Sequence, residues 1–320
     1  MDRKTPELSA RSRRMSHGLD DIELPEDVIS VVVDFLNWKL EDGNNDFSFL
    51  ANAAKISRGF RYHVKRKKAE IIENDRRNKE LKEACLLWCD PETREYAEAK
   101  YGHISEFDTS KVTDMTSLFA GQKQFNENLS KWQTKKVETI ERMFDGCSSF
   151  QGVGLTNWNT HACKSMSRMF QCCPLFNPNL TLWNVSNVKN MERMFQNASS
   201  FNRDLSWDVS KLNNIRSMFK GAVSFDGDIS AFDTSSVTNM NAVFENASSF
   251  NGGIENWNVK KVKRMYCMFK KATSFNGDIS SWDVSKVEDM GRMFWGASAF
   301  DRATIKQWNL SGVIFGYNLP

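Results

Sequence analysis

Long apolar runs are missing from this sequence of 320 residues, and so is any strong imbalance of charge. No stretch approaches the roughly 18 consecutive apolar residues that a membrane-spanning helix needs, so we expect no membrane span. The chain carries 43 basic and 40 acidic residues, a net charge of +3. So small a balance gives no electrostatic reason to expect nucleic acid or a membrane surface as a partner.

Recognisable catalytic and metal-binding motifs are also missing. The four histidines are scattered, and the seven cysteines are an odd number without the spacing of a disulfide framework. No phosphate-binding loop, nucleophile elbow or paired His/Glu motif is present. The N-terminus has charges but no apolar segment typical of a signal peptide. We therefore expect a non-enzymatic protein without cofactor or metal, with reduced thiols, in the cytoplasm or nucleus.

Aromatic residues are abundant, and they recur at a fixed period. A doublet ending in Phe returns every 24–26 residues, at Phe119, Phe144, Phe170, Phe195, Phe219, Phe244, Phe269 and Phe294. A second Phe follows each doublet by six residues, from Phe125 to Phe300. A third aromatic precedes each doublet Phe by twelve, at Phe107, Trp132, Trp158, Trp183, Trp207, Phe232, Trp257 and Trp282, and Trp308 opens a truncated ninth copy. Three aromatic columns in register indicate tandem repeats.

Within each copy the apolar pattern predicts two short elements. In the eighth copy, apolar residues from Val287 to Phe294 fall at i, i+3, i+6 and i+7, which favours a short helix or 3₁₀ turn between Ser285 and Gly296. Residues 279–282 favour a short strand. A single copy cannot bury its aromatic rings, but stacked copies can. The fold class predicted for 104–320 is therefore an α/β repeat, a leucine-rich-repeat-like solenoid of about eight 25-residue coils.

The region before the repeats is predicted to be all-helical. Residues 1–20 are expected to form a disordered tail and residues 21–64 a small helical unit. Residues 65–103 combine a charged connecting helix with a helical cap, in which Asp90-Pro91 begins a helix that Gly102 ends. Such a cap would shield the open end of the first coil. The basic run from Lys65 to Lys68 lies on this connecting helix; a nucleic-acid or localisation patch is the alternative to a solvated face.

The repeat consensus resembles a known family. Its pattern is Ile/Leu-Ser-x-Trp-Asp-Val-Ser-x-Val-x-x-Met-x-x-Met-Phe-x-x-Ala-x-x-Phe-Asn, seen best in residues 279–301. This pattern resembles the BspA-type surface-protein repeat, which is also catalogued as a domain of unknown function common in mycoplasmas. The resemblance implies a leucine-rich-repeat-like solenoid without enzyme activity, and some bacterial members are surface adhesins.

Residues 21–64 more weakly resemble an F-box. The similar features are Leu24-Pro25, the apolar run that begins at Val28, and the Ser57-Arg58-x-Phe60 segment. The span is longer than in most F-boxes because of residues 38–46. The resemblance implies that Leu24, Pro25, Val28 and Phe60 dock on a Skp-type adaptor and that the solenoid presents a substrate to a ubiquitin ligase. A plain helical cap is the alternative.

The residue directly before the third aromatic differs from copy to copy, and we predict that this column faces a protein ligand. Its members include Glu106, Lys131, Asn157, Leu182, Ala231, Asn256 and Ser281. Ordinary surface drift predicts the same mixture of side chains. A surface or secreted adhesive protein is the alternative to an intracellular scaffold. Among the solenoid thiols, Cys267 shares a column with Arg142, Arg168 and Arg193, so we expect it to be the most accessible.

Overall fold

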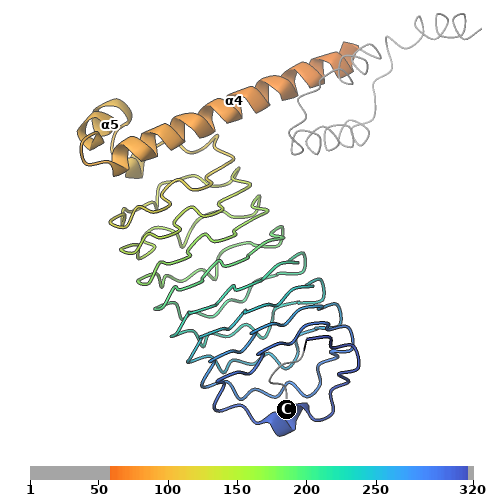
Figure 1. Cartoon of the computed structure of the whole chain (residues 1–320). Helices are drawn as coiled ribbons and strands as arrows, with labels where there is room; N and C mark the ends of the chain where they lie inside the picture. Colours follow the sequence, from red (N-terminus) through yellow and green to blue (C-terminus); the bar gives the residue numbers. More distant parts are fainter. Residues whose placement is uncertain (1–57, 316–320) are drawn as a thin grey trace, which may run out of the picture. The chain divides into compact units, whose positions relative to one another are not determined.

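The computed structural model describes residues 58–315, which form two helices and a stack of coils (Figure 1). Helix α4 spans Arg58–Cys89 and α5 spans Arg94–Tyr101. Two 3₁₀ helices follow, η1 at Ile104–Glu106 and η2 at Arg302–Ile305. The chain divides into two compact units, residues 1–76 and 77–320, and the coils belong to the second.

The last turns of α4 cap the first coil. Leu81, Ala84, Cys85 and Trp88 are buried, and their spacing of i, i+3, i+4 and i+7 makes one apolar stripe. The Asn78 side chain on the same helix accepts hydrogen bonds from two backbone N–H groups of the first coil, at residues 113 and 114. In later coils the N–H equivalent to residue 113 donates to a carbonyl of the preceding coil. Asn78 therefore supplies to the first coil the hydrogen-bond acceptor that a preceding coil supplies further along the stack.

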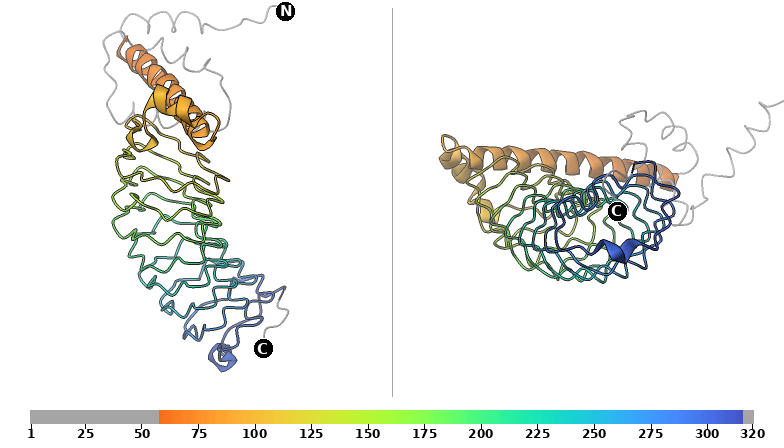
Figure 2. Two further views of the ribbon diagram at one scale, coloured as in Figure 1. Left: turned by 90° about the vertical axis from the view of Figure 1, so that its left-hand side faces the viewer. Right: turned by 60° about the horizontal axis from the view of Figure 1, so that its bottom comes forward.

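Single-residue parallel bridges connect the coils, and these bridges form one ladder along the stack. Its members are Asp114, Thr139, Ser165, Asn190, Asn214, Asn239, Arg264, Asp289 and Phe315. Each member therefore marks one coil, so nine coils are linked within residues 104–315. Figure 2 shows the coils from two further directions, lying over one another around a common interior. The repeat solenoid predicted from the aromatic columns is confirmed.

The short helix or 3₁₀ turn and the short strand predicted for each coil are not confirmed, because turns and isolated bridges stand at these positions in the described coils. In the first coil, the N–H groups of Ser117, Phe119 and Gly121 donate to carbonyls of the second coil at 2.7–2.9 Å. A helix would need these same donors for its own i to i−4 bonds. In addition, the residue two before each doublet Phe has a left-handed φ, such as 53° at Arg142. A left-handed residue cannot continue an α-helix.

The aromatic columns form the core. The doublet Phe and the second Phe of one coil stack with ring centroids 3.7–4.1 Å apart. Doublet Phe rings of successive coils lie 5.5–5.8 Å apart. Each Trp of the third column donates its indole N–H to a backbone carbonyl of the preceding coil. Stacking and hydrogen bonds therefore hold every coil to its neighbours, and the outward side chains are carried on a fixed scaffold.

Candidate functional site

The predicted ligand-facing residues lie in one exposed column. All seven of them, from Glu106 to Ser281, are exposed. Each directly precedes a buried aromatic, so the alternation of the backbone turns it to the outside. The ladder of bridges sets equivalent positions side by side, and the Lys131 ammonium forms an ion pair with Glu106 of the coil before it. Leu182, with 69% of its surface exposed, is the most apolar member of the column. That this column binds a ligand remains a prediction.

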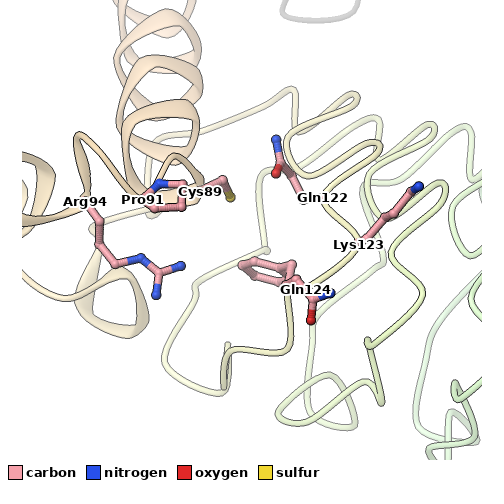
Figure 3. Close-up of a pocket in the computed structure, with 7 residues that line it drawn as sticks. Cys89, Pro91, Arg94, Gln122, Lys123 and Gln124 are labelled. Atoms are coloured by element: carbon pink, nitrogen blue, oxygen red, sulfur yellow. The ribbon is translucent and has the colours of Figure 1, made fainter.

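A hollow of about 420 Å³ lies between the cap helices and the first coil. Its lining is Cys89, Pro91, Arg94, Gln122, Lys123, Gln124 and Phe125. Figure 3 shows Arg94 and Lys123 on opposite sides of the hollow, so their charges do not converge on one point. The Arg94 Nε donates to the Trp88 carbonyl at 2.9 Å, and its guanidinium lies 5.3 Å from the Trp88 ring centroid. Arg94 is thereby held against the cap.

The thiol in this hollow is not an activated nucleophile. Burial raises the pKa of Cys89 to about 11, although the nearby Arg94 guanidinium acts in the opposite direction. Because the thiolate is the reactive form, Cys89 is protonated and weakly reactive at neutral pH. The hollow therefore holds no activated thiol.

A second face of the stack carries paired charges fixed between coils. Glu245 accepts a hydrogen bond from Lys270 at 2.8 Å and forms an ion pair with Lys220 at 2.7 Å. Burial by itself raises the pKa of Glu245, but the two lysines outweigh it, and the net pKa lies below the usual value. The carboxylate is therefore ionised at neutral pH and ties three successive coils together. Glu192 pairs similarly with Arg216, at 3.4 Å.

Two exposed aromatics on the same face were not predicted from the sequence. Tyr266 is 40% exposed and Trp295 is 45% exposed. Tyr266 stands three residues before a doublet Phe, where the other copies carry Thr, Glu, Ser, Arg, Asn or Gly. Trp295 stands one residue after a doublet Phe, where the other copies carry Ala, Asp, Gln, Lys or Glu. Aligning the copies by column would have found them, as aromatics in otherwise polar or small columns.

The prediction that Cys267 is the most accessible solenoid thiol is wrong. Cys267 is 2% exposed, whereas Cys172 is partly exposed. Other short residues in the column of Cys267 are buried as well, with Ser217 5% and Ala242 8% exposed. The Cβ atoms of Cys267, Ser217 and Ala242 are covered by the neighbouring coils, whereas the longer Arg142 in this column extends to solvent.

Neither a metal centre nor a membrane span is found in the part of the chain that the structure describes. No group of three or more His, Cys, Asp or Glu side chains within residues 58–315 could hold a metal ion. None of the helices described is both long and apolar enough to cross a membrane. Leu24, Pro25 and Val28, predicted to contact an adaptor, lie outside the described residues. Phe60 falls within α4, with its side chain outside the description.

Comparison with known proteins places the repeats in a family. The model described as "Mycoplasma protein of unknown function, DUF285" matches residues 95–154, 147–236 and 225–315. These tandem matches run from α5 through the whole ladder of bridged coils, as expected from the resemblance to the repeat found in mycoplasmas. No curated protein and no solved structure matches the chain. The chain belongs to the family of Mycoplasma proteins of unknown function, DUF285.

Proposed function

We propose that this chain is a non-enzymatic protein-interaction solenoid, in which residues 104–320 present outward side chains to a protein partner. One observation carries the proposal: the inward columns repeat Phe or Trp from copy to copy, whereas the outward column changes chemically from Glu106 to Lys131 to Asn157 to Leu182. A repeated interior with a varied exterior is the arrangement by which solenoids recognise partners.

The packing of the scaffold supports this function energetically. Ring stacking and indole hydrogen bonds order the coils before any partner arrives. Binding then loses little backbone entropy, so that more of the contact energy appears as affinity. A flexible array with the same side chains would bind more weakly.

Photo-crosslinking tests the proposal. A benzoyl-phenylalanine would be placed at Asn157 in one variant of the full-length chain and at exposed Tyr266 in another, and each would be irradiated in an extract of the source cells. Discrete protein adducts that an excess of unlabelled wild-type chain abolishes are the expected result. Non-saturable adducts, or none, at both exposed positions would refute the interaction function.

The first residues suggest what the interaction is for. We propose that residues 21–64 dock on a Skp-type adaptor through Leu24, Pro25, Val28 and Phe60, which would make the chain a substrate-recognition subunit of a cytoplasmic or nuclear ubiquitin ligase. The support is the sequence resemblance of Leu24-Pro25 and Ser57-Arg58-x-Phe60 to an F-box.

A pull-down with a purified Skp-type adaptor tests this role. Wild type should recover the adaptor, and a variant with Leu24→Ala and Pro25→Ala should not. Lys131→Ala, which changes only the solenoid, is the control and should recover the adaptor like wild type. Failure of the wild-type chain to recover the adaptor would refute the ubiquitin role, and surface labelling of the native protein on intact cells would favour the adhesive alternative.

A further inference from the structure

Coils seven and eight carry a surface that differs from the rest of its face. We define it by Tyr266, Lys270, Lys271, Arg292 and Trp295 and name it the aromatic-basic surface. The Nζ atoms of Lys270 and Lys271 lie 5.7 and 5.3 Å from the Trp295 ring centroid. Those distances allow cation–π attraction, which holds the exposed indole in place.

Tyr266 is held in position by a glycine in the next coil. Gly291 occupies the same column one coil further on, and a Cβ built there would lie 3.1 Å from the Tyr266 Cδ2. The Tyr266 ring therefore lies against the backbone of Gly291, and a larger side chain at position 291 would displace the ring. The backbone N–H of Tyr266 donates to the Asn241 side chain at 2.8 Å, which fixes its base.

The charge of this surface is mainly positive. Lys270 shares Glu245 with Lys220. Arg292 and Lys271 form no ion pair with any residue of the described part of the chain, and Arg292 is exposed. Exposed Trp and Tyr beside an unpaired Arg is the composition that concentrates binding energy at protein interfaces.

We propose that the aromatic-basic surface docks an acidic peptide segment of a protein partner, with carboxylates on Arg292 and Lys271 and an apolar side chain between Tyr266 and Trp295. This inference rests on the proposed interaction function and names the chemistry of the partner. Positive charge selects the acidic segment, and the two half-exposed rings select its apolar residue.

A nucleic-acid strand fits the same face less well. A strand that continued along the face would meet Glu192 and Glu141, which are held in place by contacts with Arg216 and Ser165. Carboxylates at these positions repel phosphates, and nucleic-acid affinity depends on neutralising many phosphates in a row. A short acidic peptide needs only the two coils that carry the surface.

Fluorescence anisotropy with a defined probe tests the proposal. The probe is a fluorescein-labelled peptide, Asp-Glu-Asp-Phe-Glu-Asp-Leu-Asp-Glu-Asp, titrated with full-length protein. Trp295→Ala and Arg292→Glu should each weaken binding by about ten-fold or more, as expected for an interface hot spot. Leu175→Ala and Lys136→Glu change an exposed apolar and an exposed charged residue elsewhere on the solenoid and should bind like wild type. Both altered residues of the surface are exposed, and unchanged thermal melts would show that the variants are folded.

Three outcomes would overturn the proposal. One is equal peptide affinity in wild type and both surface variants. Another is undiminished binding of a peptide in which Asn and Gln replace the acids. The third is a short oligo(dT) that binds more tightly than the peptide and loses affinity in the same variants, which would assign the surface to nucleic acid. Saturable crosslinks from Asn157 alongside any of these outcomes would leave the interaction function standing, so the two proposals fail separately.

Discussion

Replacing Trp183 by Ala tests the stacked core most directly. Trp183 is 3% exposed and lies between Trp158 and Trp207, with ring centroids 6.5 and 6.4 Å away and nearly parallel planes. Its indole N–H donates to the Leu155 carbonyl at 2.9 Å. Truncation of a buried Trp to Ala costs about 3–5 kcal/mol. We expect the upper half of this range, because contacts with both neighbouring coils are lost at once.

The hydrogen bond contributes less than the ring. The Leu155 carbonyl also accepts from the backbone N–H of Trp158 at 3.1 Å, so it keeps a partner when the indole is removed. Trp183→Phe should therefore destabilise by about 1–2 kcal/mol, of which about 1 kcal/mol is the net value of one hydrogen bond and the rest comes from the smaller ring. Phe107 and Phe232 occupy this column naturally, which shows that a Phe ring fits it.

Urea unfolding followed by near-ultraviolet circular dichroism measures both effects. Because each coil contacts only its neighbours, Trp183→Ala should also split the unfolding into two transitions, one for each half of the array. Trp308→Ala removes a ring that stacks on Trp282 alone, and should loosen only the last coil. A Trp183→Ala midpoint within error of wild type, or a single transition as steep as that of wild type, would refute the stacked-core account.

Three further predictions follow from the described contacts. A thiol reagent applied to the folded protein should modify Cys172 before buried Cys267, and Cys172→Ser but not Cys267→Ser should remove the fastest phase. Hydrogen bonds from the backbone and side chain of Ser210 lower the pKa of Asp208. The contribution of Asp208 to stability is therefore complete above its ordinary pKa of 3.8 and is lost as the pH falls through the lower pKa of the folded state. Asp208→Asn should reduce the fall in melting temperature below pH 3.8. Gly154 has a φ of +89°, and its Cβ would lie 2.3 Å from a backbone nitrogen. Gly154→Ala should cost at least about 1–3 kcal/mol in chemical unfolding, whereas Gly252→Ala, without a left-handed φ, should cost less.

The secondary structure of a coil could not be predicted from the repeat. Apolar residues at three- and four-residue intervals fit a helix, but the deciding hydrogen-bond partner of Ser117 is Glu141, in the next coil. The left-handed residues of the doublet turn include Arg142, Arg168 and Arg193, not glycine, so no residue type marks the turn. The apolar pattern within one copy cannot predict a backbone hydrogen bond between two coils.

The exposure of single side chains could not be predicted from the sequence either. Cys267 and Arg292 occupy one column, yet the first is buried and the second is exposed. The exposure of Trp295 beside Lys271 likewise depends on which side chains the neighbouring coil brings alongside. These properties belong to the stack and to no single copy.

What the sequence by itself determined is the repeat, its period and the residues of the core. One copy cannot bury the large aromatics that recur in register every 24–26 residues, but stacked copies can bury them against the equivalent residues of their neighbours. The pattern therefore predicts a stacked array. The tertiary structure alone decided the path of the backbone within a coil, the cap made by Asn78 and the aromatic-basic surface of coils seven and eight. Each of these depends on atoms of different coils, or of a helix and a coil, that only the fold brings within hydrogen-bonding or van der Waals distance.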